Sequence, residues 1–133
     1  MANKEAHGAL ANELLLQMRE ADHEAEWAIA VDAGYYAVFH SMEALNALEC
    51  RDSYTFADAA DILENVLVER VLDRSVLQAY DYLFYFRRGV IYGCHQPTRR
   101  QTAEYCRVVE DCIAQIEPLL RGATEHNFVS ERR

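Results

Sequence analysis

The sequence contains little glycine and proline and no long apolar segment. Of its 133 residues, 5 are glycine and 2 are proline. This scarcity argues against a β-sandwich or β-barrel, because those folds need many tight turns. No apolar run reaches the roughly 18–20 residues that a membrane-spanning helix requires. We therefore expect a helical protein that does not associate with a membrane.

The sequence also lacks a regular cysteine framework. The spacing of Cys50, Cys94, Cys106 and Cys112 fits neither a set of disulfides nor a zinc site. We expect reduced thiols in the core of a cytoplasmic protein, with neither a metal nor a cofactor. Glycine-rich phosphate loops and the common hydrolase and metalloprotease motifs are missing from the sequence as well.

Basic charge is scarce in the first two thirds of the chain. The net charge is −9; residues 1–86 hold 5 basic and 16 acidic side chains, whereas residues 87–133 hold 8 basic and 6 acidic ones. An acidic body disfavours long-range attraction of a polyanion. A local set of arginines, which we call the arginine strip, can still hold a phosphate or an acidic partner. The strip consists of Arg87, Arg88, Arg99, Arg100 and Arg107.

Apolar residues make up 51% of the chain, and they recur every three to four positions, which is typical of amphipathic helices. This pattern predicts one all-α domain over residues 1–122, an up-down bundle of four to five antiparallel helices joined by short connections. Residues 123–133 are expected to form a loose tail. The helices are expected at about 3–22, 25–50, 55–70, 74–93 and 98–122.

Local signals mark the helix ends. Gly93 and Pro97 are expected to end the fourth helix, and Gly122 the fifth. Thr98 and Gln101 have the spacing of a capping box at the start of the fifth helix. The side chains expected to face the core are Leu10, Leu14, Met18 and Ala21 in the first helix, Trp27, Val31, Gly34, Val38, Met42, Leu45 and Leu48 in the second, and Tyr105, Val108, Val109, Cys112, Ile113, Ile116 and Leu120 in the fifth.

Two segments resemble the HEPN family of helical proteins. The second helix contains Tyr35-Tyr36-Ala37-Val38-Phe39-His40, similar to a "YYA-x-FH" core, and the fourth ends with Arg87-Arg88-Gly89-Val90-Ile91-Tyr92-Gly93. The resemblance covers roughly residues 6–121. It implies a bundle of four or five helices that usually forms a homodimer. Some members are metal-independent RNases that act as toxins beside a nucleotidyltransferase-like antitoxin, whereas others bind nucleotides or serve as interaction modules.

The resemblance offers two assignments of the catalytic motif. In one, Arg88 and His95 enclose six residues, and Tyr92 lies between them at helical spacing. His95 would then act as base and acid in RNA cleavage, and Arg88 would hold the phosphoryl oxygens. In the other, Arg87 is the family arginine and Tyr92 takes the place of the histidine, in the tyrosine–glycine form. Tyrosine is a poor base at neutral pH, since its ordinary pKa is about 10.

The arginine strip offers a binding function instead. Arg99 and Arg100 lie in the first turn of the fifth helix, near Arg87, where they suit a phosphate or a nucleotide. The alternative is that these arginines pair with acids of the same chain or of a second subunit.

Other titratable and aromatic residues have a structural interpretation. His40 is expected to be a buried histidine with satisfied hydrogen bonds, and the acids Asp32, Glu43 and Asp61 are expected on solvated faces. The aromatic residues of the fourth helix span all of its sides, so some of them are expected in a dimer interface. They are Tyr80, Tyr82, Tyr85 and Phe86.

The sequence thus favours a HEPN-like module that binds a nucleotide, RNA or a protein partner such as a nucleotidyltransferase-like antitoxin. The alternatives are a metal-independent endoribonuclease that uses Arg88 and His95 at a dimer interface, and a structural interaction protein without a ligand. Two departures from the active motif favour a non-catalytic protein. Gly89 follows Arg88 where active members usually have Asn or Asp, and Cys94 stands where they tend to have tyrosine.

Overall fold

The fold is described from a computed structural model, which covers residues 4–48 and 74–131. All regular secondary structure in these two ranges is helical. The helix expected at residues 55–70 lies outside the described residues, as do Cys50 and Asp61. The helices are α1 (Lys4–His23), α2 (Trp27–Leu48), α4 (Ser75–Ile91) and α5 (Arg99–Glu131).

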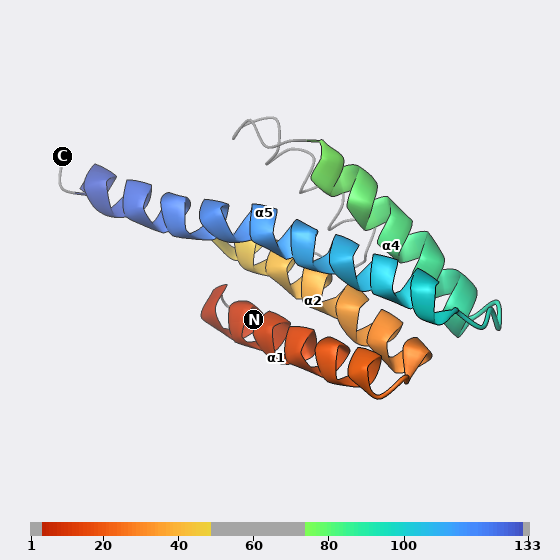
Figure 1. The fold of residues 1–133 in the computed structure, drawn as a ribbon. Coiled ribbons are helices and arrows are strands. Elements are labelled where there is room, and N and C mark those ends of the chain that lie inside the picture. Colours follow the sequence, from red (N-terminus) through yellow and green to blue (C-terminus); the bar gives the residue numbers. More distant parts are fainter. Residues whose placement is uncertain (1–3, 49–73, 132–133) are drawn as a thin grey trace.

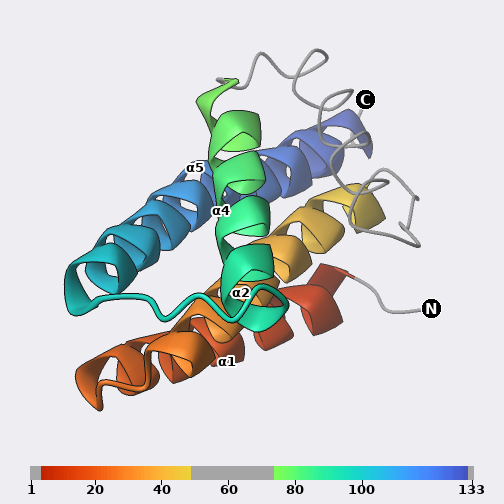
Figure 2. The ribbon, with the colours of Figure 1, turned by 90° about the vertical axis from the view of Figure 1, so that its right-hand side faces the viewer.

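The described helices form an all-α bundle, which confirms the all-α class of the prediction. Helices α1 and α2 run in opposite directions, as do α4 and α5, whereas α2 and α5 lie side by side in the same direction (Figure 1). Helix α1 packs on α2 and α5. Helix α4 lies across α2 and α5 (Figure 2). Among the described residues, no helix combines the length and apolar character that a membrane span needs.

The core lies where the inner faces of these four helices meet, and most of the expected core residues are in it. Leu10 and Trp27 are exceptions. Of the Leu10 surface 38% is exposed, and Trp27 is half-buried and lines a surface hollow. The side chain of Leu48 lies outside the described residues. The inward stripe of α1 passes one position further along, through Ala11, Leu15 and Met18, because the helical period leaves Leu10 at the edge of that face. The largest fully buried side chains are Met18, Val31, Tyr35, Val38, Met42, Leu45, Tyr80, Leu83, Tyr105 and Ile116.

Helix α2 approaches its neighbours most closely at Gly34. A Cβ atom at this position would lie 2.8 Å from the Met18 sulfur, 3.0 Å from a Val109 methyl carbon and 3.3 Å from the Tyr105 ring. These distances are shorter than ordinary van der Waals contacts. The absence of a side chain at Gly34 therefore lets α2 touch α1 and α5 at the same level.

The predicted capping box is confirmed. The backbone N–H of Gln101 donates to the Thr98 hydroxyl at 3.1 Å, and the Thr98 N–H donates to Oε1 of Gln101 at 2.9 Å. Helix α4 ends at Ile91. Gly93 follows, at a point where a Cβ atom would come within 2.8 Å of the Gly89 carbonyl oxygen, so glycine is needed for the chain to turn there.

The expected end of the last helix at Gly122 is wrong. Helix α5 runs through Gly122 to Glu131, and its end projects beyond the other helices (Figure 1). Glycine stops a helix when it adopts a positive φ, but none of the described glycines has one. A single glycine inside a helix costs only about 1 kcal/mol relative to alanine, so the helix can continue.

Candidate functional site

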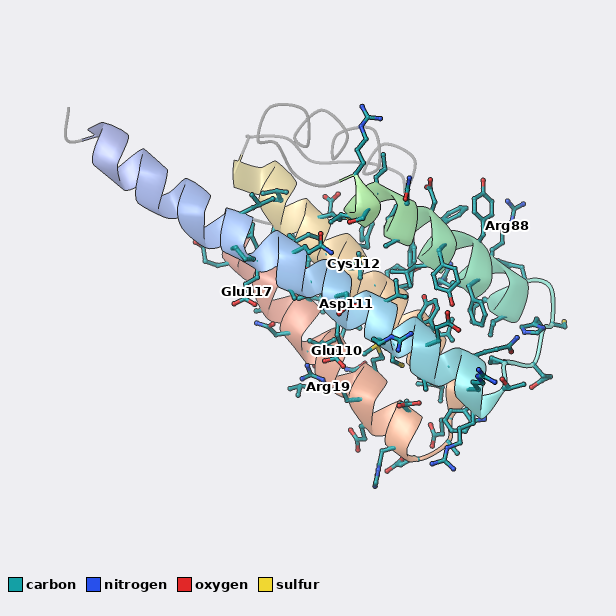
Figure 3. All side chains as sticks on the ribbon, turned by 45° about the horizontal axis from the view of Figure 1, so that its top comes forward. Arg19, Arg88, Glu110, Asp111, Cys112 and Glu117 are labelled. Carbon is teal, nitrogen blue, oxygen red and sulfur yellow. The ribbon has the colours of Figure 1, made fainter. Side chains whose placement is uncertain are left out.

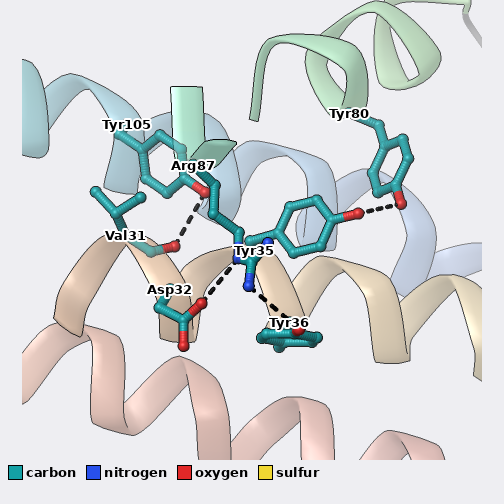
Figure 4. A network of polar contacts seen from close by, with 7 residues as sticks. All are labelled: Val31, Asp32, Tyr35, Tyr36, Tyr80, Arg87 and Tyr105. Carbon is teal, nitrogen blue, oxygen red and sulfur yellow. Dashed lines mark hydrogen bonds and ion pairs between the residues drawn. The ribbon is translucent and has the colours of Figure 1, made fainter. Parts of the chain in front are cut away.

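Arg87 is the most extensively contacted charged residue of the family motif. It lies on the face of α4 that packs against α2, and only 7% of its surface is exposed. Its Nε donates to Oδ1 of Asp32 at 2.8 Å, and its Nη2 donates to the Tyr36 hydroxyl at 3.3 Å (Figure 4). The guanidinium carbon lies 5.2 Å, 4.9 Å and 5.9 Å from the ring centroids of Tyr35, Tyr36 and Tyr92. Asp32 therefore balances the charge, while aromatic rings cover it.

The electrostatics of Arg87 follow from this arrangement. Burial disfavours the charged guanidinium and would lower its pKa. The hydrogen bond to Asp32, together with the electrostatic effects of Tyr36, Asp32 and Tyr92, outweighs this cost, so the pKa of Arg87 lies above its ordinary value. The guanidinium is charged at every physiological pH. Because its Nε is directed at Asp32, Arg87 has less capacity for a bidentate grip on a phosphate than an arginine in solvent.

Behind Arg87, two tyrosines join α2 to α4. The hydroxyls of Tyr35 and Tyr80 lie 2.5 Å apart, and their rings stack with centroids separated by 5.6 Å (Figure 4). Burial raises the pKa of Tyr35, and it raises the pKa of Tyr80 to about 12. A third tyrosine, Tyr105 on α5, donates to the carbonyl oxygen of Val31 at 3.0 Å. These phenols are neutral at physiological pH and link three helices.

The first catalytic assignment requires Arg88, Tyr92 and His95 to work together. Helix α4 ends before Tyr92, so the three residues do not continue along one helical face. Arg88 is exposed and points away from the bundle (Figure 3). Tyr92 is 72% exposed. No described contact joins Arg88 to His95, and their catalytic role stays a prediction.

His95 lies in the loop before α5 and is held from two sides. The Phe86 ring meets it edge to face at 5.9 Å, and His95 Nε2 lies 3.3 Å from Oε1 of Gln101. That oxygen also accepts the Thr98 N–H. Because an amide oxygen only accepts, His95 must donate from Nε2. In the neutral ring, Nδ1 is therefore the nitrogen that is open to a proton.

The arginine strip divides into two parts in the structure. Arg87 turns inward to Asp32, whereas the other four members are exposed and make no ion pair among the described residues. Arg100 and Arg107 line a surface hollow of about 410 Å³ together with Ala103 and Glu104. Arg99 lines a neighbouring hollow, which shares Ala103 with the first. The predicted nucleotide-binding set of Arg87, Arg99 and Arg100 is thus not gathered at one point.

The solvated position expected for single acids is wrong for Glu43, which is buried with 3% of its surface exposed. Asp32 keeps 43% of its side chain exposed but is paired with Arg87. Periodicity did not reveal this, because the pairing of an acid depends on which helix lies opposite. His40 is half-buried, and its Nδ1 lies 3.1 Å from Nδ1 of His7. Burial and the neighbouring His7 lower the pKa of His40, in line with a structural histidine.

The cysteines divide between core and surface. Cys106 and Cys112 are buried, as expected, and burial raises the pKa of each thiol to about 12. Cys94 is exposed, so the expectation of a core position is wrong for this residue. It lies in the loop after α4 with a φ of 56°, outside the helical stripes that reach the core. Among the described residues, no group of three or more metal-binding side chains is found.

Sequence reasoning missed the role of Asp32 and the Tyr35–Tyr80 contact. One signal was available for Asp32, which lies one helical turn before Tyr35 and Tyr36 on the same side of α2. No known protein-family model matches the chain, and no curated protein is significantly similar to it in sequence. The resemblance to the HEPN family therefore rests on the residues quoted from α2 and α4.

Proposed function

We propose that this chain is a HEPN-like, non-catalytic module that binds a nucleotide or a protein partner through the outward part of the arginine strip. One observation carries the proposal. Arg88, Arg99, Arg100 and Arg107 are exposed and have no ion-pair partner among the described residues, whereas Arg19 and Arg87 each have one. Unpaired arginines near the start of one helix favour the binding of phosphate or carboxylate groups.

The contacts of Arg87 argue against catalysis by the second motif assignment. A phosphate would have to compete with Asp32 for the guanidinium of Arg87, which is already bound at 2.8 Å. The residue in the place of the base is Tyr92, and the tyrosine hydroxyl is a poor general base at neutral pH. The pair of Arg87 and Asp32 is better explained as a link between α2 and α4.

Binding of nucleoside triphosphates to the protein, followed by calorimetry at low and moderate salt, tests this function. We expect binding that weakens with added salt and that falls at least about tenfold when Arg100 and Arg107 are both replaced by glutamine. Arg19→Gln is the matched control, because Arg19 on α1 is bonded to Glu110 on α5 (Figure 3). Equal affinity in the double variant and the control would exclude this surface as the nucleotide site.

The proposal also allows a protein partner to bind the outward part of the arginine strip. The HEPN resemblance suggests a nucleotidyltransferase-like antitoxin, and co-purification with a candidate of that class tests it. Loss of the complex in the Arg100→Gln, Arg107→Gln variant would support the partner-binding form of the proposal. Binding of neither nucleotides nor such partners would favour a structural interaction protein without a ligand.

We also propose that the chain forms a homodimer through the outer face of α4. Tyr85 and Arg88 are three residues apart on that face, and Tyr92 follows the end of the helix; the two tyrosines are 65% and 72% exposed. Exposed tyrosines of this kind are favoured at interfaces. Sedimentation of the protein and of Tyr85→Ser tests the dimer, which we expect the substitution to weaken. Tyr82→Ser, with a half-covered ring on the side of α4 nearer α5, is the comparison.

The endoribonuclease stays as a second candidate because of one observation. The hydrogen bond to Gln101 leaves Nδ1 of His95 open as a proton acceptor. RNA cleavage in the presence of EDTA is the test, with His95→Ala and Arg88→Ala as variants. Cleavage that both variants abolish would establish this candidate and overturn the non-catalytic proposal. Cleavage unchanged in both would show that these two residues are not its catalytic pair.

A further inference from the structure

A second surface hollow lies between the α1–α2 turn and the start of α5. These two segments lie at the same end of the bundle (Figures 1 and 2). The volume of the hollow is about 410 Å³, which is within the range of small-molecule sites, about 300–1,000 Å³. Its lining residues are Asp22, His23, Ala25, Trp27, Arg99 and Ala103.

The hollow exists because small side chains lie beside a large one. Trp27 is the only tryptophan of the chain and begins α2. Ala25 in the turn and Ala103 on α5 leave space around its indole ring. The turn itself is tight, because Ala25 has a φ of 62° and the Glu26 N–H donates to the Ala21 carbonyl at 2.8 Å. The Trp27 indole therefore forms one wall of the hollow, and the turn before it fixes its position.

The polar groups around the hollow are not satisfied by one another. The side chains of Asp22, Trp27 and Arg99 make no hydrogen bond, ion pair or ring contact within the part of the chain that the structure describes. Asp22 and Arg99 carry opposite charges and line the same hollow, yet they are not in ion-pair contact. The hollow thus offers the Asp22 carboxylate as a hydrogen-bond acceptor, the Arg99 guanidinium as a donor and the Trp27 indole as a flat aromatic surface.

Asp22 lies at the end of α1 beside the start of α5. It is half-buried and lines the hollow together with Arg99 and Ala103 of α5. In line with this position, the charge of Asp22 is, after burial, the second cause of the raised pKa of the Cys106 thiol on α5.

The surrounding charges narrow the class of ligand. The end of α1 and the turn carry four acids, which repel a polyanion such as a nucleotide. They are Glu20, Asp22, Glu24 and Glu26. Arg99 repels a ligand that is only cationic. A molecule with both charges close together avoids both penalties, because its ammonium group can face Asp22 while its anionic group faces Arg99.

We propose that this hollow binds a small zwitterion, namely a free α-amino acid with a flat or apolar side chain. The ammonium group lies against Asp22, the carboxylate against Arg99 and the side chain on the Trp27 indole. This hollow adjoins the Arg100–Arg107 hollow, since Ala103 lines both. Binding of the amino acid does not depend on the nucleotide-binding proposal, because Arg100 and Arg107 do not line this hollow.

The fluorescence of Trp27 gives a direct test on the whole protein. L-phenylalanine is the probe, with phenylpropionate (no ammonium) and phenethylamine (no carboxylate) as matched analogues and AMP as a polyanion. We expect a saturable change with phenylalanine and binding at least about tenfold weaker for each analogue. No saturable change with phenylalanine, or equal affinity for all four compounds, would overturn the proposal.

Two variants assign the charged contacts. Asp22→Asn should remove the preference for phenylalanine over phenylpropionate. Arg99→Gln should remove the preference for phenylalanine over phenethylamine. Arg74→Gln, at an exposed position at the start of α4, is the control and should leave both preferences unchanged. Ligand-detected NMR of the phenyl protons gives a second readout, because it does not depend on how Asp22 affects indole emission. Preferences that persist in both variants would contradict the assigned contacts.

Discussion

Arg87 of α4 and Asp32 of α2 are joined by a hydrogen-bonded ion pair of 2.8 Å between Nε and Oδ1. Only 9% of the arginine side chain is exposed, whereas 43% of the aspartate side chain is. The pair lies under the aromatic rings of Tyr35 and Tyr36. It joins α2 to α4 through two residues that are far apart in the sequence.

Removing the charge of Asp32 should destabilise the bundle. We expect Asp32→Asn to lower the free energy of unfolding by about 1–2 kcal/mol, because a nearly buried guanidinium loses its counter-charge. The exposure of Asp32 keeps this cost below that of a fully buried pair. Urea denaturation measures it. Asp111→Asn, at an exposed position on α5 (Figure 3), should change stability by less than about 0.5 kcal/mol, and an equal effect of both substitutions would contradict the role of Asp32.

The two buried hydroxyls of Tyr35 and Tyr80 should be energetically coupled. Each single substitution by phenylalanine removes the hydrogen bond between them and is expected to cost about 1–2 kcal/mol. The double variant should cost less than the sum of the two, because the second substitution removes a hydroxyl that has already lost this bond. A double-mutant cycle by chemical denaturation measures the coupling. Strict additivity would show that the 2.5 Å contact contributes nothing to stability.

Stability should fall in alkaline solution. Burial raises the pKa of Tyr80 from 10.0 to about 12 and that of Cys106 and Cys112 from 9.0 to about 12. The folded state therefore holds these protons more tightly than the unfolded state. The resulting stabilisation is complete below the unfolded pKa values and is lost as the pH rises through about 9–12.

Denaturation at about pH 8 and about pH 11 measures this loss. A Cys112→Ala variant should lose less stability over the same interval, because one buried thiol fewer has to ionise. A stability that is constant or higher at the alkaline pH would contradict the burial of these groups.

Two glycines should respond in opposite ways to alanine. Gly34→Ala is expected to lower the free energy of unfolding by about 1–3 kcal/mol, because its Cβ would press on Val109 and Tyr105. Gly89→Ala should raise it by up to about 1 kcal/mol, since the position is helical and nothing lies within 4 Å of the added atom. Thermal or chemical denaturation of the two variants gives the comparison. A stabilising Gly34→Ala would show that the three helices can move apart at no cost.

Local features of this chain were predictable from local sequence. The capping box of Thr98 and Gln101 involves neighbours in the chain, and the inward stripe of α2 follows a period of about 100° per residue, so neither needs a long-range contact. The end of α5 was less predictable. Gly122 permits a helix to stop but does not force it, because the outcome depends on whether glycine adopts a positive φ.

The sequence by itself determined an all-helical bundle, the four described helices and most of their buried faces, because periodicity and capping act over one or two turns. Only the tertiary structure decided which of two adjacent arginines faces inward. Arg87 and Arg88 differ by about 100° around α4, and the position of Asp32 on another helix selects Arg87. The same holds for the hollow beside Trp27, whose charged groups come from segments far apart in the chain. Such pairings depend on helix packing, which no local pattern encodes.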